Sequence, residues 1–174
     1  YTTVSSGGLI SISAGALANY TTLKNASAIL YGSANSTTVS SGSILNVEHG
    51  ASATYTTISS GGTENVNALA TAAYDTIKSG GVENVYGVAI GAVINKGGIQ
   101  NIVGGEADSA TISSGASQIL TSGAYASSTT IGSGGYQSIE SSTATKTTIG
   151  SGGLPYIAHG TVTSTVIDSY GSQL

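Results

Sequence analysis

Two stretches of this chain have nearly the same sequence. Residues 56–66 read Thr-Thr-Ile-Ser-Ser-Gly-Gly-Thr-Glu-Asn-Val, and residues 76–85 read Thr-Ile-Lys-Ser-Gly-Gly-Val-Glu-Asn-Val. Each contains a short β-branched segment, a pair of glycines and a second short segment that ends in valine. Glycine adopts positive φ angles without steric cost, so a glycine pair between such segments indicates a sharp corner between two strands. The pattern predicts a fold built from repeated short strands.

The same pattern recurs along the whole chain. We call the residue equivalent to Ile58 the anchor of each repeat, and successive anchors lie 16 to 19 residues apart. The ten anchors are Val4, Leu23, Val39, Ile58, Ile77, Ile94, Ile112, Ile131, Ile149 and Ile167. A glycine follows three residues later at Gly7, Gly42, Gly61, Gly80, Gly97, Gly115, Gly134 and Gly152. Regularity at a period of this size indicates a repeat architecture.

Two further positions recur at fixed intervals from the anchors. An aliphatic residue stands eight residues after the anchor at Ile12, Val47, Val66, Val85, Ile102, Leu120, Ile139 and Ile157. The second repeat alone breaks this row, with Tyr31. A small or aliphatic residue stands five residues before the next anchor at Ala18, Ala34, Ala53, Ala72, Ala89, Ala107, Ala126, Ala144 and Val162. These intervals predict that all variation in length falls in one corner, between the two rows.

A repeat of this size has the length of one coil of a β-solenoid. Nineteen residues at ~3.3 Å each give a path of roughly 60 Å, and equivalent residues would stack ~4.8 Å apart in successive coils. We therefore expect an all-β parallel β-helix of about ten coils of 16–19 residues, each with two strands and two corners. Residues 1–174 form a single repeat array, which we expect to be a segment of a longer one. Stacked antiparallel hairpins remain as an alternative architecture.

The composition excludes several kinds of partner. Charged residues make up 7% of the chain, with four lysines and no arginine. Nucleic-acid binding draws on clustered Lys and Arg, so we expect no nucleic-acid partner. No stretch approaches the roughly 18 apolar residues of a membrane-spanning helix, so the chain itself is not expected to lie in a membrane. The absence of cysteine excludes disulfides and cysteine-based zinc sites.

The acidic residues and histidines do not form a recognisable site in the sequence. Glu64 and Glu83 occupy equivalent positions and would stack about 5 Å apart, similar to the two carboxylates of a retaining glycosidase. The same position holds Gln100, Gln118, Gln137 and Gln173. We interpret the whole row as an outward polar ladder, and His49 and His159 as surface residues too far apart to share a metal. We expect no catalytic residue, cofactor or metal ligand, and therefore no enzyme.

Two rows of residues are candidates for a contact surface. Tyrosine stands three residues before the anchor at Tyr1, Tyr20, Tyr55 and Tyr74. Threonine stands one residue before it at Thr3, Thr22, Thr38, Thr57, Thr76, Thr111, Thr130 and Thr148. Outward aromatic rings can stack on sugars or on another rod, and the alternative is that the tyrosines only fill a corner of the coil. A flat threonine row raises ice binding as a remote alternative, but charges and glycines interrupt the companion row that it requires.

The repeats resemble a known family. The string Thr-Thr-Val/Ile-x-Ser-Gly-Gly-x-Gln/Glu-Asn-Val, clearest in residues 56–66 and 76–85, is similar to the passenger repeats of bacterial autotransporter adhesins. The related types are the adhesin involved in diffuse adherence and the self-associating autotransporters. The resemblance covers nearly the whole chain and is weakest in residues 23–36. It implies a right-handed β-helix that a separate outer-membrane barrel displays at the bacterial cell surface, with O-glycosylation on Ser or Thr.

This resemblance favours a structural or adhesive function outside the cell. We expect the segment to mediate self-association, or attachment to surfaces and to host or matrix glycans and proteins. Long polar faces suit many weak contacts whose avidity accumulates. The alternative is a passive stalk that displays a functional domain lying outside this segment.

Overall fold

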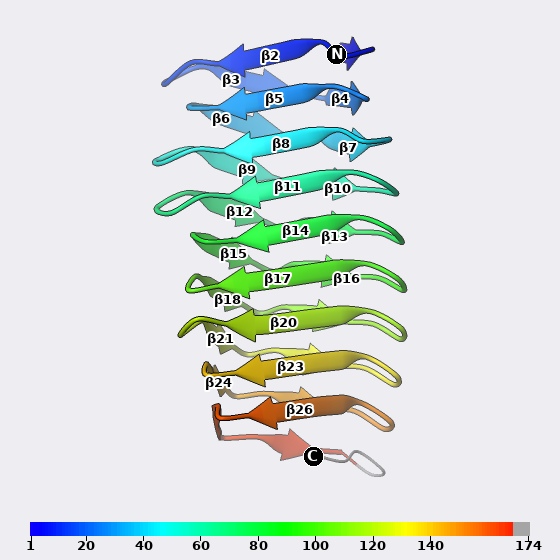
Figure 1. Cartoon of the computed structure of the whole chain (residues 1–174), viewed down its shortest axis with the longest axis vertical. Coiled ribbons are helices and arrows are strands. Elements are labelled where there is room, and N and C mark those ends of the chain that lie inside the picture. The colour runs from blue at the N-terminus through cyan, green and yellow to red at the C-terminus, as the bar shows by residue number, and fades with distance from the viewer. Residues whose placement is uncertain (169–174) are drawn as a thin grey trace.

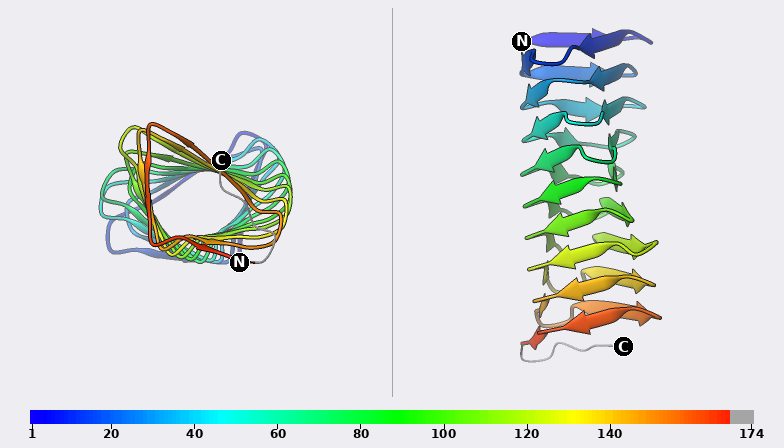
Figure 2. Two further views of the ribbon diagram at one scale, coloured as in Figure 1. Left: turned by 90° about the horizontal axis from the view of Figure 1, so that it is seen from below. Right: turned by 90° about the vertical axis from the view of Figure 1, so that its left-hand side faces the viewer.

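The chain folds as a rod of stacked coils. In the computed structural model, which describes residues 1–168, every strand belongs to one of three sheets that run along the rod (Figure 1). In Figure 1 the front strands such as β5 (Ser27–Leu30) and β8 (Ile44–Val47) point to the left and the strands behind them point to the right while the chain descends, which is the right-handed winding that the resemblance implies. Figure 2 shows the same stack of coils from below and from the side. The predicted parallel β-helix is confirmed. Stacked antiparallel hairpins are excluded, because the strand pairs of all three sheets are parallel.

Each coil contributes one strand to each sheet. The anchor sheet consists of β1 (Thr2–Ser5), β4 (Thr21–Lys24), β7 (Thr38–Ser40), β10 (Thr57–Ile58), β13 (Thr76–Ile77), β16 (Val93–Ile94), β19 (Thr111–Ile112), β22 (Thr130–Ile131), β25 (Thr148–Ile149) and β28 (Val166–Ile167). The second sheet consists of β2 (Leu9–Ile12), β5 (Ser27–Leu30), β8 (Ile44–Val47), β11 (Thr63–Val66), β14 (Val82–Val85), β17 (Ile99–Val103), β20 (Ser117–Thr121), β23 (Tyr136–Glu140) and β26 (Leu154–Ala158). The alanine sheet consists of β3 (Leu17–Asn19), β6 (Ser33–Asn35), β9 (Ser52–Thr54), β12 (Thr71–Ala73), β15 (Val88–Ile90), β18 (Glu106–Asp108), β21 (Tyr125–Ser127), β24 (Thr143–Thr145) and β27 (Thr161–Thr163).

The number of coils and of strands per coil differs from the prediction. Within residues 1–168 the rod has nine complete coils and the anchor strand of a tenth, against about ten predicted. Each coil has three strands where two were predicted, because the alanine row forms a short strand of its own. No helix that could cross a membrane is found in the described part of the chain.

The extra corner between the alanine sheet and the anchor sheet has no glycine that recurs from coil to coil. One residue there, three before the anchor, takes a left-handed conformation, as in Tyr55 (φ 57°), Ser109 (φ 58°) and Lys146 (φ 53°). Such residues rarely adopt positive φ, so the sequence gives no signal for this turn. By contrast, the corner after the anchor uses glycine as predicted, for example Gly61 (φ 73°) and Gly97 (φ 74°).

The predicted constant interval of eight residues between the anchor and the second aliphatic position is wrong for the second coil. Leu30, not Tyr31, takes the second aliphatic position there, since it pairs with Ile12 in one neighbouring coil and Val47 in the other. Leu30 comes seven residues after its anchor Leu23, so this coil lacks one residue at the corner after the anchor. The left-handed Asn25 (φ 49°) turns the chain there. Length therefore varies at two corners of the coil and not at one.

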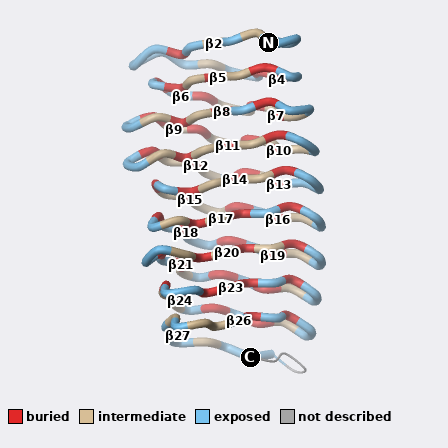
Figure 3. The backbone as a smooth tube through the Cα atoms, viewed as in Figure 1, coloured by how far each residue is buried: buried red, intermediate tan, exposed pale blue. Residues whose placement is uncertain are grey.

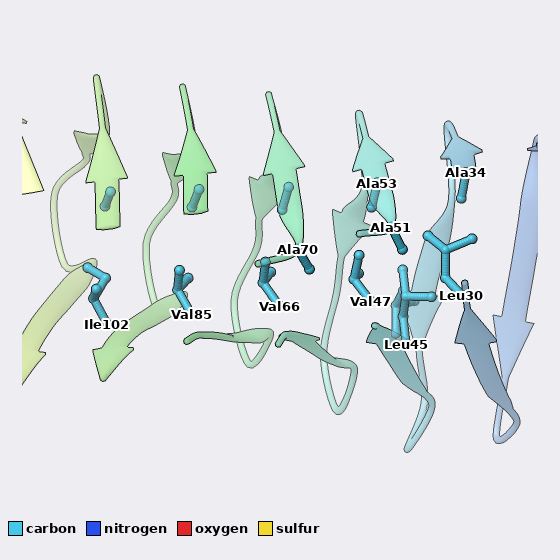
Figure 4. Close-up of a cluster of buried hydrophobic side chains, with 14 of the residues drawn as sticks. Leu30, Ala34, Leu45, Val47, Ala51, Ala53, Val66, Ala70, Val85 and Ile102 are labelled. Carbon is cyan, nitrogen blue, oxygen red and sulfur yellow. The ribbon is translucent and has the colours of Figure 1, made fainter. Parts of the chain in front are cut away.

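The core is a pair of aliphatic columns. One column combines the second aliphatic row with the alanine row, and Figure 4 shows Leu30, Val47, Val66, Val85 and Ile102 in line along the rod. From the fourth to the ninth coil the anchors form a separate column with Ala116. Buried residues recur at the same place in each coil, as Figure 3 shows. In the second and third coils the two columns merge, because the position between them holds Ala28 and Leu45.

The tightest corners predict a strict need for glycine. Gly87 belongs to one of the two coils with only four residues from the second aliphatic position to the alanine, and a Cβ there would lie 2.5 Å from the Ala70 carbonyl oxygen and closer still to that of Asn67. Gly123 has positive φ (76°) but open space around it. We expect Gly87→Ala to lower the free energy of unfolding by about 3 kcal/mol, as in overpacked cores. Gly123→Ala should cost about 1 kcal/mol, for its left-handed backbone alone. Urea unfolding measures both, and equal losses would contradict the packing of this corner.

Candidate functional site

The tyrosine row lies on the outside of the rod, at the left-handed corner. Tyr1 stacks on Tyr20 with ring centroids 5.0 Å apart, and Tyr55 stacks on Tyr74 at 5.5 Å. The interplanar angles are 25° and 21°. Ser36 separates the two pairs, and Tyr55 remains 58% exposed. The row therefore presents two stacked aromatic pairs to the solvent.

The threonine row lies outward on the anchor sheet, two residues further along each coil. Thr22, Thr38, Thr57 and Thr76 follow one another in register and are half-buried. Thr111, Thr130 and Thr148 continue the row as exposed residues. Val93 interrupts it between Thr76 and Thr111. The predicted contact residues thus form neighbouring rows on one side of the rod, each with one interruption near its middle.

A third outward row is an asparagine ladder on the second sheet. Asn65, Asn84 and Asn101 each donate a side-chain hydrogen bond to the asparagine of the preceding coil, beginning at Asn46, over 2.8–2.9 Å. Asn65 and Asn84 therefore each donate to one neighbour and accept from the other. The ladder joins four successive coils along the surface.

The predicted outward ladder of glutamate and glutamine is wrong, because these side chains point into the core. Glu64, Glu83, Gln100, Gln118 and Gln137 are all completely buried, with exposed fractions of 0%. We call these five residues the polar file. They lie between the two aliphatic columns, where Leu45 stands in the third coil. Gln173, which was placed in the same row, lies outside the described residues.

The polar file is continuously hydrogen-bonded through its glutamines. Gln137 Nε2 donates to Gln118 Oε1, Gln118 Nε2 to Gln100 Oε1, and Gln100 Nε2 to Glu83 Oε2, each at 2.7 Å. Pro155 follows Gln137 in register and has no side-chain donor, so Gln137 Oε1 ends the file without a partner. A buried amide costs free energy unless it is hydrogen-bonded, and stacking on an identical amide meets that need.

Three carboxyl groups meet at the other end of the file. Asp75, two residues before its anchor, is also completely buried. Asp75, Glu64 and Glu83 each have a carboxylate oxygen within 4.8 Å of the others, and we call them the acid cluster. Thr56 holds two of them, with its backbone N–H donating to Asp75 Oδ1 at 2.6 Å and its Oγ1 to Glu64 Oε1 at 3.3 Å. One oxygen of each carboxyl has no hydrogen-bond partner.

Burial dominates the electrostatics of the cluster. Desolvation, and then the charges of Asp75 and Glu83, raise the pKa of Glu64 well above its ordinary value. Desolvation and the charge of Glu83 likewise raise the pKa of Asp75, against the opposing hydrogen bond from the Thr56 backbone. Desolvation raises the pKa of Glu83 to about 7, opposed by the hydrogen bond from Gln100. Two carboxylates 4.8 Å apart would repel by about 3.5 kcal/mol at an effective dielectric constant near 20, so full ionisation is disfavoured.

The cluster is the only group of three potential metal ligands in residues 1–168. The two histidines lie on the surface, as predicted, and His159 forms part of a left-handed corner (φ 56°). No cavity is found in the described part of the chain, and the three carboxyl side chains are completely buried.

These features define the chain as a repetitive β-solenoid rod with outward ladders of identical side chains. No protein-family model matches it, and no curated protein matches it significantly. Among solved structures, the TibC-catalysed, hyper-glycosylated fragment of TibA superposes with a TM-score of 0.96 at 31% identity. The match covers 99% of this chain and 66% of that one.

TibA is an autotransporter adhesin, and the matching fragment comes from its passenger. The present chain belongs to the same family, the passenger repeats of autotransporter adhesins, in agreement with the resemblance in sequence.

The buried polar file and the half-buried asparagine ladder are expected to differ in how much they contribute to stability. Gln118→Leu keeps a side chain that the equivalent position accepts as Leu45, but it leaves Gln137 Nε2 and Gln100 Oε1 unpaired. We expect a loss of about 2–4 kcal/mol in the free energy of unfolding, from two buried polar groups without partners. The matched control is Asn84→Ala in the asparagine ladder, where water can replace the lost bonds and the loss should stay below about 1 kcal/mol. Equal losses in urea unfolding would show that the file contributes nothing beyond a surface ladder.

Proposed function

We propose that this segment is an adhesive rod, which binds other copies of itself or extended glycans through its outward rows. The observation that carries this proposal is the separation of the two kinds of side chain. The carboxyl and amide side chains of the acid cluster and the polar file are completely buried in the core, whereas hydroxyl and aromatic side chains repeat outward along the rod. A surface of this kind offers many weak and equivalent contacts, and their avidity grows with the number of coils engaged.

A catalytic function is not part of the proposal. The two glutamates whose spacing resembles that of a glycosidase are completely buried, so a sugar chain cannot reach them without unfolding the coil. Display at the bacterial cell surface by a separate barrel is the arrangement that we infer from the family.

The outward hydroxyls also support O-glycosylation in this chain. The TibA fragment is hyper-glycosylated by TibC. We infer that exposed residues such as Ser114 and Thr130 are the acceptors, and that buried ones such as Thr56 and Thr129 are not. Peptide mass spectrometry after co-expression with TibC tests this, and sugar on the buried threonines would contradict it.

The adhesive proposal predicts clumping that depends on one side of the rod. We expect beads coated with this chain to aggregate, and the substitutions Tyr20→Ser, Tyr55→Ser and Tyr74→Ser, combined with Thr57→Lys and Thr130→Lys, to slow settling by about tenfold or more. Serine occupies the tyrosine position in other coils with the same left-handed φ, so the fold should be preserved.

The control carries lysines on the outward positions of the alanine sheet, as Ser52→Lys, Thr71→Lys and Thr143→Lys. Aggregation of this control should match that of the unmodified chain. If unmodified beads neither clump nor bind glycan-coated surfaces, the segment is a stalk.

A further inference from the structure

The side-chain hydrogen bonds of the polar file all point the same way along the rod, toward the acid cluster. Every glutamine of the file donates from Nε2 toward the preceding coil, and Gln100 and Gln118 also accept on Oε1 from the following one. Glu83 accepts from Gln100 in the same way, but an ionised carboxylate has no hydrogen to pass on toward Glu64. Glu83 Oε1 and Glu64 Oε2 accordingly have no hydrogen-bond partner. A protonated carboxyl has the same donor and acceptor groups as a glutamine amide.

Glu64 and Asp75 need a proton for the same reason. Their carboxyl groups are within hydrogen-bonding reach of each other, and two ionised carboxylates cannot bond. Asp75 already accepts from the Thr56 backbone, which favours Asp75 as the acceptor and Glu64 as the donor.

No positive charge faces the cluster from any neighbouring strand. The buried residues at the equivalent and adjacent inward positions of the third to sixth coils are Thr37, Thr56 and Ala92 before the anchor strands, Ile58 and Ile77 in the anchor sheet, Leu45 and Gln100 in the second sheet, and Ala53, Ala72 and Ala89 in the alanine sheet. None of these residues titrates. The four lysines and both histidines are exposed, on the outside of the rod. Within residues 1–168, protons are therefore the only counter-charge that the surroundings of the cluster provide.

We propose that Glu64, Asp75 and Glu83 hold protons inside the rod and form an acid-stabilised lock between the fourth and fifth coils, which loosens as the medium becomes alkaline. The folded chain keeps protons that the unfolded chain has already released above the ordinary carboxyl pKa. Unfolding then releases protons, and stability falls as the pH rises. The pH range over which Glu83 lowers the stability runs from its ordinary pKa of 4.5 to its raised pKa of about 7. For Glu64 and Asp75 the corresponding range begins at the ordinary pKa and extends upward, because burial raises the pKa of both groups.

The test is urea unfolding of the complete chain between pH 5 and pH 9. We expect the unfolding equilibrium constant to rise with pH within this range by up to about tenfold per pH unit for each proton released. Glu83→Gln extends the glutamine file by one coil, so it should be more stable than the unmodified chain at pH 8 and less dependent on pH. Glu106→Gln is the matched control, because Glu106 is exposed on β18, and its pH profile should equal that of the unmodified chain.

Two results would overturn the proposal. One is an identical pH profile for the unmodified chain and Glu83→Gln. The other is stabilisation of the unmodified chain at pH 8 by millimolar Ca²⁺ or Mg²⁺, reversed by a chelator and absent in Glu83→Gln, which would mean that a cation and not a proton occupies the cluster. If Glu83→Gln fails to fold, the ¹³C shifts of the Glu side-chain carboxyls in the unmodified chain decide. Buried glutamates in the ionised form at pH 6 would contradict the lock.

Discussion

The structure depends on one constraint, the in-register stacking of each residue on its equivalent in the next coil. Parallel backbone hydrogen bonds run along the rod in all three sheets, so a side chain meets nearly the same side chain above and below it. An inward position must therefore suit a neighbour of its own kind. This requirement explains the aliphatic columns and the alanine row, and it explains why the repeat is preserved where the length of the coil is not.

The same constraint allows polar residues inside so thin a core. A single buried glutamine would lack partners, but a row of glutamines supplies each amide inside the row with a donor and an acceptor. The row divides the aliphatic core into two columns from the fourth coil onward. At Glu83 the row changes from amide to carboxyl, and this side chain can donate a hydrogen bond to the preceding coil only when it is protonated. Stability and pH dependence thus have a common origin in stacking.

Much of the fold could be predicted from the sequence, because the anchors, the glycines and the alanines each recur at one place in the coil. The direction of Glu64 was predicted wrongly, although a signal was present: Val66 is inward, and side chains alternate along a strand, so a residue two positions earlier must point the same way. The same rule applied to Asp75 and Ile77 would have brought the three carboxyls together. The left-handed corner at Tyr55 and Ser109 could not be predicted, because neither residue signals positive φ. The position of Leu30 was missed because the shortened corner at Asn25 lacks the glycine that marks it elsewhere.

The inward side of each strand stacks in the core, and the outward side forms the proposed contact surface. Both roles require each coil to advance along the rod by one strand spacing. Distances between spin labels on the outward threonine row measure this advance directly, and the chain has no native cysteine to interfere with labelling. With one label at Thr22→Cys and the second at Thr111→Cys, Thr130→Cys or Thr148→Cys, the labels lie five, six or seven coils apart. In-register stacking predicts distances of ~24, ~29 and ~34 Å, rising by one strand spacing per coil. Distances that fail to rise steadily with the number of coils would contradict the stacked rod.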